Sequence, residues 1–276
     1  MMLRPRDSQD QRQLETSLRI TPEPAEILWT HDVFGNCVAV ARFRSRAREL
    51  SFISMLRLDH AGQDGAMAGW IEDHARTMPF SYDPEDMPDL QRSIERQQPD
   101  PYHALSNWAH SFLRSNGPTE TLALLEAMTV RIHRQFTYKG RQEAGIQAPP
   151  DTLRLGTGSC RDFAVLMIEA LRCLGLAARF VSGYIYVPSG NGRDRHHGGG
   201  NTHAWVQAYV PGAGWLEFDP TNGIVGNRDL IRVAVVRDPR QAVPLSGSWT
   251  GVAADCLGME VSIRVTSDEA PTGLQR

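Results

Sequence analysis

Apolar and polar residues alternate along the first sixty positions of the chain. The segments SLRITP, AEILWTHDVFGNCVAVARF and ELSFISMLRLDH are rich in β-branched and aromatic residues and alternate with a period of two, which is typical of half-buried strands. Gly35 and Asn36 interrupt the second segment and predict a hairpin turn. We therefore expect an N-terminal antiparallel β domain of sandwich type over residues 1–60.

The pattern changes after residue 60. Residues 61–100 are rich in Gly, Pro, Asp and Gln, which indicates a connecting region with few regular elements. Helical spacing then appears in YHALSNWAHSFLRSNG and TETLALLEAMTVRIHRQF. Four strand-like segments come last: LAARFVSGYIYV, THAWVQAYV, GWLEFDP and IRVAVVRD. Because helices precede strands instead of alternating with them, the pattern predicts an α+β core over residues 101–276.

One helix of this core is apolar on nearly every side. The segment FAVLMIEAL predicts a buried helix from Asp162 to Arg172, and Gly175 stands where a left-handed residue would end it. Cys160 then lies at the N-terminus of this helix, after Gly158 and Ser159. Unpaired N–H groups and the helix dipole favour the thiolate form of a cysteine at such a position, and the thiolate is the nucleophilic form.

A structural cysteine is the alternative for Cys160, because cysteine is among the most buried residue types. We interpret Cys37, Cys173 and Cys256 in that way, as core residues. The four cysteines lie far apart and form no CxxC pair, so they predict neither a disulfide framework nor a zinc site.

Two residues further along the chain favour a nucleophile. His203 stands at the start of one predicted strand and Asp219 at the end of the next, and antiparallel pairing would bring these two ends together. A carboxylate beside an imidazole holds the ring in one tautomer and keeps it basic. Taken singly, His203 could bind backbone and Asp219 could form an Asx turn before Pro220. Together with Cys160 they predict a catalytic nucleophile, base and orienting residue.

Composition narrows the function classes. The net charge of −3, with 41% hydrophobic and 22% charged residues, is typical of a globular protein and does not favour nucleic-acid binding. No apolar stretch is long enough to cross a membrane, and MMLRPRDSQDQRQLETS lacks the apolar segment of a signal peptide. We therefore expect no membrane partner and a cytoplasmic location.

Three long motifs of the chain resemble a known family. GSCRDFAVLMIEALRCLGLAARFVSGY, THAWVQAYVPGAGWLEFDPTNG and VAVVRDPRQAVPLSGSWTG are similar to segments of the transglutaminase-like superfamily, in its bacterial branch with an N-terminal β domain. The resemblance implies a papain-like core in which the nucleophile's helix packs on an antiparallel sheet. It also implies that Cys160 is the nucleophile, His203 the base and Asp219 the residue that orients the base.

The activity that this resemblance implies is acyl transfer or hydrolysis at a carboxamide or peptide carbonyl, through a thioester. The substrate would be a protein or peptide, with an amine as the second substrate of a cross-linking reaction, and no cofactor or metal is implied. A cysteine protease is the first alternative. A non-catalytic interaction scaffold is the second, although all three residues of the predicted triad are present.

Several residues near the triad have two interpretations. Asp162 fits a helix cap better than a catalytic role, and Arg161 fits a solvated surface position. Trp205 fits either the core or a groove wall, as do Tyr184 and Tyr186. The glycine-rich loop PSGNGRDRHHGGGN precedes His203 and is expected to border the site, and its histidines, His196 and His197, are interpreted as solvated side chains and not as metal ligands.

Overall fold

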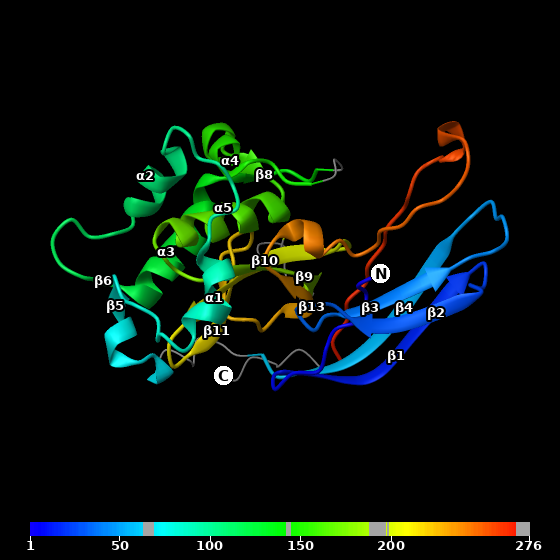
Figure 1. Cartoon of the computed structure of the whole chain (residues 1–276), viewed down its shortest axis with the longest axis horizontal. Coiled ribbons are helices and arrows are strands. Elements are labelled where there is room, and N and C mark those ends of the chain that lie inside the picture. Colours follow the sequence, from blue (N-terminus) through cyan, green and yellow to red (C-terminus); the bar gives the residue numbers. More distant parts are fainter. Residues whose placement is uncertain (63–68, 142–144, 188–196, 198, 269–276) are drawn as a thin grey trace, which may run out of the picture.

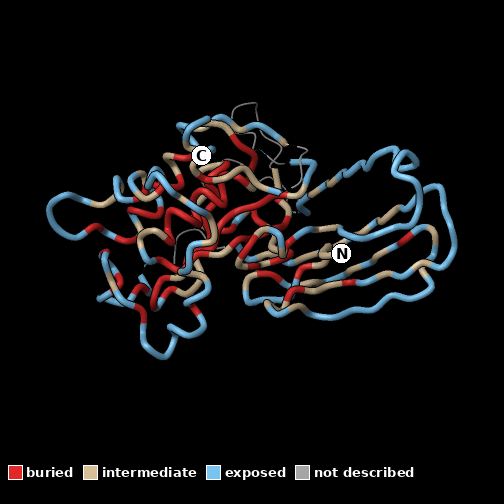
Figure 2. The backbone as a smooth tube through the Cα atoms, turned by 45° about the horizontal axis from the view of Figure 1, so that its top comes forward, coloured by how far each residue is buried: buried red, intermediate tan, exposed pale blue. Residues whose placement is uncertain are grey.

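The computed structural model of the chain describes residues 1–62, 69–141, 145–187, 197 and 199–268. Long N-terminal strands extend from a larger body in which helices surround a central sheet (Figure 1). Buried residues concentrate in the larger body, whereas the N-terminal strands are mostly exposed or half-buried (Figure 2). None of the described helices combines the length and the apolar composition that crossing a bilayer requires.

The N-terminal strands pair as two antiparallel ribbons. β1 (Gln11–Thr21) pairs with β4 (Ser51–His60), and β2 (Glu26–His31) pairs with β3 (Cys37–Arg42). Gly35 has a φ of +76° in the loop between β2 and β3, where the sequence predicted a hairpin turn. Every residue of β2 is exposed, so this ribbon contributes little to the core. The predicted strands are present, and the extent of residues 1–60 as an independent domain stays a prediction.

Two side-chain amides join the N-terminal part to the central sheet. Gln11 donates from Nε2 to the carbonyl of Arg232 at 2.9 Å, and its Oε1 accepts the Arg232 N–H at 2.9 Å. Asn36 binds the carbonyl and N–H of Val235 in the same manner, both at 2.9 Å. Arg232 and Val235 belong to β13 (Leu230–Val236), an outer strand of the sheet, so the two amides imitate a neighbouring strand at its free edge.

The connecting region contains more regular structure than the sequence predicted. It holds the short helix α1 (Met87–Ile94), the 3₁₀ turn η2 (Asp73–Ala75) and β5 (Thr77–Met78), which pairs with β6 (Thr119–Glu120). The helix α1 buries only Leu90, and for that reason its apolar pattern is weak in the sequence.

Three helices surround the central helix of the body. α2 (Ala104–His110) and α3 (Thr121–Gln135) correspond to the two segments with helical spacing. α4 (Pro149–Leu155) was not predicted, because its two prolines suggested a break in the chain. Proline is nonetheless well suited to the first turn of a helix, because an N–H group there has no carbonyl partner within the helix and its absence costs no hydrogen bond. Gly156 ends α4 with a φ of +64°.

The central helix is α5 (Cys160–Cys173), and it is buried along almost its whole length, as its sequence predicted. It packs against the sheet on one side and against α2 and α4 on others. Phe163 and Leu166 are among its fully buried side chains, and each such side chain contributes roughly 1.5–3 kcal/mol through its burial. Gly175 follows the helix with a φ of +81°, in the predicted left-handed conformation. This packing holds the first residue of α5 firmly in place.

The central sheet has the strand order β12-β11-β10-β9-β13, with every neighbouring pair antiparallel. Its other members are β9 (Ala178–Ile185), β10 (His203–Val210), β11 (Gly214–Asp219) and β12 (Ile224–Val225). The four predicted strands are therefore confirmed, and so is the α+β class with the nucleophile's helix packed on an antiparallel sheet.

The remaining elements are short. β7 (Thr137–Tyr138) and β8 (Thr157–Gly158) form a parallel pair that sets Tyr138 beside Gly158, two residues before Cys160. η3 (Pro239–Gln241) follows the sheet. The chain then runs along the N-terminal strands and includes η4 (Ala253–Asp255) (Figure 1).

Candidate active site

Cys160 is the first residue of α5, as the sequence predicted. Ser159 precedes it in an extended conformation and forms a capping box with Asp162. The N–H and the hydroxyl of Ser159 both donate to Oδ2 of Asp162 at 2.8 Å. The N–H groups of the first helical turn have no carbonyl partner within the helix, so they surround Cys160 with partial positive charge.

The carboxylate of Asp162 is fully buried and holds the loop that precedes α5. Arg141 donates to it from Nε at 2.9 Å and from Nη2 at 3.2 Å, and the N–H of Gln147 donates at 2.7 Å. All of its hydrogen bonds fix the start of the helix and the adjoining loop. The capping role that the sequence favoured for Asp162 is therefore confirmed.

His203 and Asp219 lie together, as the predicted hairpin required. His203 is the first residue of β10 and Asp219 the last residue of β11, and these strands pair antiparallel. Nε2 of His203 lies 2.8 Å from Oδ2 of Asp219, with both side chains excluded from solvent.

Asp219 uses its two oxygens for different purposes. Oδ1 accepts the N–H groups of Thr221 at 2.9 Å and Asn222 at 3.3 Å, which is an Asx turn. Oδ2 accepts from His203 and from Nδ2 of Asn222 at 2.7 Å. The sequence left open whether Asp219 forms an Asx turn or binds His203, and in the structure it does both. Burial acts to raise the pKa of Asp219, but the charge and hydrogen bond of His203, with the bonds from Asn222 and Thr221, hold that pKa below its usual value.

The imidazole of His203 is oriented with its other nitrogen free. Burial favours the neutral ring, yet the charge and hydrogen bond of Asp219, with a smaller contribution from the neighbouring Cys160, raise the pKa of His203 above its ordinary value. Nδ1 is buried and makes no hydrogen bond of normal geometry to the described residues. Because Nε2 is bound to Asp219, Nδ1 is the nitrogen that remains for the Cys160 thiol. The structure therefore brings the three predicted side chains together.

Exposure decreases along this row of side chains. Cys160 keeps 8% of its surface accessible, against 1% for His203 and 0% for Asp219, so Cys160 is the most accessible residue of the three. Tyr138 lies beside Cys160: burial raises the pKa of its phenol, and the nearby Cys160 and Asp219 raise it further. The ring of Tyr138 stacks on His197, with centroids 4.7 Å apart.

The aromatic residues near the triad separate into two groups. Trp205 is fully buried behind His203, so it belongs to the core and does not wall a groove. Tyr184 and Tyr186 are half-buried, and the hydroxyl of Tyr184 donates to the carbonyl of Leu3 at 3.2 Å. Tyr184 therefore helps to join the sheet to the start of the chain.

The glycine-rich loop before His203 is described only in part. His196 lies outside the described residues, as do most residues of the loop. His197 is exposed, and its N–H donates to Oδ1 of Asn222 at 2.6 Å. Arg161 is half-buried, and its Nη2 donates to the carbonyl of Arg141 at 3.3 Å, so it is not the freely solvated residue that we expected.

The other cysteines differ from their predicted positions. Cys173 and Cys37 are only half-buried, and Cys256 is exposed, which contradicts a core role for Cys256. Cys256 lies in the segment after the sheet; its residue type suggested burial, but the side chain is exposed. All four cysteines are free thiols.

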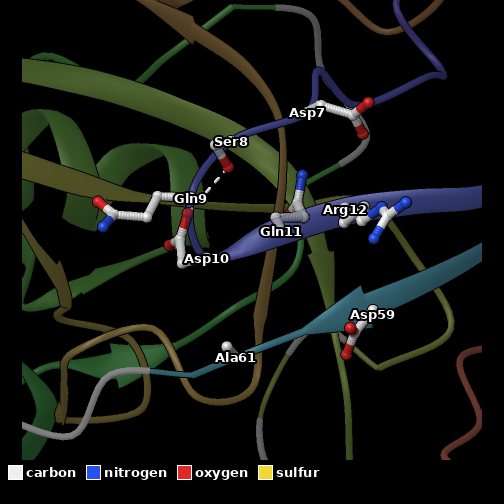
Figure 3. A pocket seen from close by; sticks show the side chains of 8 residues that line it. All are labelled: Asp7, Ser8, Gln9, Asp10, Gln11, Arg12, Asp59 and Ala61. Atoms are coloured by element: carbon white, nitrogen blue, oxygen red, sulfur yellow. Dashed lines mark hydrogen bonds between the residues drawn. The ribbon is translucent and has the colours of Figure 1, made fainter.

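Acidic side chains also gather away from the triad. A pocket of about 380 Å³ at the start of β1 is lined in part by Asp7, Asp10 and Asp59 (Figure 3). Asp7 accepts the N–H of Gln13 at 2.6 Å, and Asp10 is paired with Arg232, so two of the three carboxylates already have partners. Within the described ranges, no group of three or more His, Cys, Asp or Glu side chains could hold a metal ion.

Two family models match separate parts of the chain. The model of the transglutaminase-like superfamily matches residues 107–220, and that of the bacterial transglutaminase-like N-terminal region matches residues 1–59. An uncharacterized protein of Mycobacterium tuberculosis is 31% identical over 257 residues, which cover 89% of this chain and 79% of that protein. The chain belongs to the transglutaminase-like superfamily.

Two further proteins extend the comparison. A protein-glutamine gamma-glutamyltransferase of Pseudomonas aeruginosa is 35% identical over 112 residues, which cover 38% of this transglutaminase-like chain and 16% of that enzyme. Among solved structures, a candidate cysteine protease from Cytophaga hutchinsonii has a TM-score of 0.63 and 21% identity, and covers 87% of this chain and 76% of its own. At that identity the structural likeness concerns the fold.

Sequence reasoning missed three residues of this transglutaminase-like site. Tyr138 reaches it through the β7–β8 pair, and Arg141 through the buried Asp162. The sequence around Tyr138 and Arg141 does not predict these contacts, because each residue lies about twenty positions before the group that it contacts. Asn222 could have been found, since it follows Asp219 by three residues in DPTNG, a spacing at which a turn returns a side chain to the carboxylate.

Proposed function

We propose that this protein catalyses cysteine-dependent acyl transfer or hydrolysis at a carboxamide or peptide carbonyl. The observation that carries the proposal is the His203–Asp219 pair, which leaves Nδ1 of His203 free beside Cys160 at the N-terminus of α5. In this assignment Cys160 is the nucleophile, His203 the base and Asp219 the orienting residue.

The first half of the reaction forms a thioester. His203 accepts the Cys160 proton at Nδ1, and the thiolate adds to the carbonyl carbon of the substrate. The carbon–nitrogen bond then breaks, and the imidazolium returns the proton to the departing ammonia or amine. The N–H of Cys160 is a candidate donor to the oxyanion, since it belongs to the unpaired first turn of α5; such donors contribute about 3 kcal/mol each in serine enzymes.

The second half releases the acyl group. Water or an amine attacks the thioester carbonyl and gives its proton to Nδ1 of His203. The carbon–sulfur bond breaks, and the sulfur recovers its proton from the imidazolium. An amine produces a new amide, which is cross-linking, whereas water produces deamidation or proteolysis. Asp219 stays ionised throughout, because four hydrogen bonds stabilise its charged form.

The comparisons support a protein or peptide as the substrate. The name of the P. aeruginosa protein-glutamine gamma-glutamyltransferase supports a glutamine carboxamide as the acyl donor, and an amine as the acceptor is our own proposal. The name of the C. hutchinsonii protein supports hydrolysis of a peptide bond, so a cysteine protease is the second candidate.

Labelling by a thiol-directed electrophile at mildly acid pH tests the nucleophile. An ordinary thiol, with a pKa near ~8.5, is protonated and slow under these conditions, whereas a thiolate paired with imidazolium reacts. Cys160→Ala should abolish rapid labelling, and Cys256→Ala, which removes the exposed thiol, should preserve it. Undiminished labelling of Cys160→Ala would place the reactive thiol elsewhere and overturn the proposal.

Two assays separate the candidate reactions. Incorporation of a fluorescent amine into a glutamine peptide measures acyl transfer, and casein cleavage measures proteolysis. Loss of either activity in Cys160→Ala identifies the reaction. If a cellular phenotype of the gene's deletion were fully restored by Cys160→Ala, the protein would instead be a non-catalytic scaffold.

For the compartment, we propose the cytoplasm. The support is chemical: four thiols stay unpaired, which fits a reducing environment. Cell fractionation with an antibody against the whole chain tests this, and recovery outside the cytoplasmic fraction would reject it.

A further inference from the structure

Asn222 occupies a central place in the hydrogen bonds around Asp219, although it exchanges no proton in the proposed reaction. Its Nδ2 donates to Oδ2 of Asp219 at 2.7 Å and lies 3.4 Å from Nε2 of His203. Its backbone N–H also points to Asp219, at 3.3 Å from Oδ1. Side chain and backbone of one residue therefore bind both oxygens of the carboxylate.

The orientation of the amide is fixed by His197. A backbone N–H can only donate, and the N–H of His197 lies 2.6 Å from Oδ1 of Asn222, so this atom must be the amide oxygen. The same amide donates from Nδ2 to the carbonyl of His197 at 3.2 Å. The NH₂ group is consequently the part of Asn222 that faces Asp219.

Two donors thus converge on Oδ2 of Asp219. Because Nε2 of His203 and Nδ2 of Asn222 share this oxygen, their 3.4 Å separation is a contact between two donors and not a hydrogen bond. An oxygen with two donors is held in one position and stays ionised. His203 must then carry its proton on Nε2, which leaves the lone pair on Nδ1, toward Cys160.

We infer that Asn222 is a positioning residue, which acts through Asp219 to keep His203 in the tautomer that accepts the Cys160 proton. The inference rests on the proposed function. It requires a hydrogen-bond donor at the Nδ2 position, and a side chain of the same shape that only accepts cannot replace it.

Asn222→Asp tests this requirement, because it replaces the NH₂ group by an oxygen of similar size. Two carboxyl groups at this distance cannot both ionise easily, so one of them keeps a proton with a raised pKa. At low pH the new carboxyl is protonated and donates to Asp219, as the amide does. At higher pH the donor is lost and two negative charges oppose each other.

The readout is the rate at which iodoacetamide alkylates Cys160 in the full chain, measured by peptide mass spectrometry. We expect the ratio of the Asn222→Asp rate to the wild-type rate to fall at least tenfold between about pH 5 and about pH 8. Asn222→Ala, which has no donor at any pH, should be about tenfold slower than wild type throughout. Asn116→Ala, a change at an exposed asparagine, should leave the rate unaltered.

A role confined to the stability of the turn would give a different result. In that case the ratio for Asn222→Asp would stay constant across the pH range, and equal rates for Asn222→Ala and wild type would likewise overturn the inference. Because Asn222 is half-buried in a turn, urea unfolding of each variant monitors the fold separately. If Cys160 of the wild type shows no enhanced reactivity at acid pH, the proposed function fails. If wild-type Cys160 is reactive but the ratio of the Asn222→Asp rate to the wild-type rate does not change with pH, only the inference about Asn222 fails.

Discussion

The indole of Trp205 lies behind the imidazole of His203, with ring centroids 5.9 Å apart and an angle of 25° between the ring planes. Trp205 is fully buried, and its Nε1 donates to Oε2 of Glu217 at 3.0 Å. The orientation of His203 therefore depends on packing from the sheet as well as on its bond to Asp219.

Trp205→Phe should destabilise the protein and slow the reaction of Cys160. The change keeps an aromatic ring but removes the donor to buried Glu217, and an unsatisfied buried acceptor costs about 1–3 kcal/mol. Urea unfolding measures the loss, and iodoacetamide alkylation measures the reactivity. Trp249→Phe, at a position that is 58% exposed, should change stability by less than about 0.5 kcal/mol. Equal effects of the two substitutions would contradict a special role of Trp205.

Asp219→Asn should lower the turnover rate roughly 1,000- to 10,000-fold, by analogy with the equivalent change in a serine triad. An amide can present its NH₂ group to Nε2 of His203, which would move the ring proton to Nδ1 and block acceptance of the Cys160 proton. Amine incorporation or casein cleavage gives the measurement. Asp151→Asn, at an exposed carboxylate, is the control. A loss of less than about tenfold would argue that His203 does not depend on Asp219.

The His203–Asp219 pair should make stability depend on pH. Because the pKa of His203 is higher in the folded than in the unfolded protein, the pair stabilises the fold fully at pH values below the unfolded-state pKa, near ~6.5. This stabilisation is lost as the pH rises through the folded-state pKa of His203. The lowered pKa of Asp219 adds stability that is complete above about 4 and is lost as the pH falls through the folded value. The difference in unfolding free energy between wild type and His203→Gln should therefore be greatest between about pH 4 and about pH 6.5. A difference that is constant from acid to alkaline pH would refute this.

The contact between Asp10 and Arg232 should stabilise the attachment of the N-terminal strands. Both side chains are largely buried, and Arg232 also donates to Glu217 at 2.7 Å. Asp10→Asn should cost about 2 kcal/mol, the typical contribution of a hydrogen bond between charged groups. Despite burial, which acts to raise it, the Arg232 hydrogen bond and charge lower the pKa of Asp10 to about 2, so wild type should lose this contribution as the pH falls from about 4 toward that value. Asp59→Asn, at an exposed position on the same pocket, should have little effect, and a similar loss in both variants would count against the pair.

Gly183→Ala should disturb the sheet beneath the site. A Cβ atom at this position would lie 2.0 Å from the carbonyl oxygen of Ile231 and 2.7 Å from the indole of Trp205, so β9 and β13 would have to separate. Overpacking of this kind costs about 1–3 kcal/mol. Thermal unfolding gives the measurement, with Gly140→Ala as the control, since a Cβ there meets no atom within 4 Å. Equal melting temperatures for Gly183→Ala and wild type would contradict the packing.

The predictable parts of the fold are those with a strong local pattern. The buried helix α5 carries a nearly continuous apolar run, the four long strands of the sheet are rich in β-branched and aromatic residues, and Gly175 marks the end of the helix. α1 and α4 were not predicted, because both helices are short, with eight and seven residues. Both also bury few side chains and have proline in their first turn. Gln11 and Asn36 bind partners in β13 that lie 221 and 199 positions further along the chain. No local sequence pattern predicts contacts over such a separation.

The candidate site was predictable where chain geometry determined it. A helix start and two strand ends joined by one short turn bring Cys160, His203 and Asp219 together. The side chains that support these residues depend on contacts that no local pattern predicts. Arg141 reaches the start of α5 through Asp162, and Trp205, which stacks on His203, is held by Glu217. The exposure of Cys256 was likewise mispredicted, because residue type alone does not show what covers a segment.

The two amides that bind β13 have a consequence for the solubility of the core. An outer strand with bare peptide groups is a template for pairing with other molecules. Gln11 and Asn36 occupy those groups at Arg232 and Val235, so they protect the sheet against self-association. A truncated chain that begins after residue 60 would lose both caps and should aggregate, even though it would keep Cys160, His203 and Asp219.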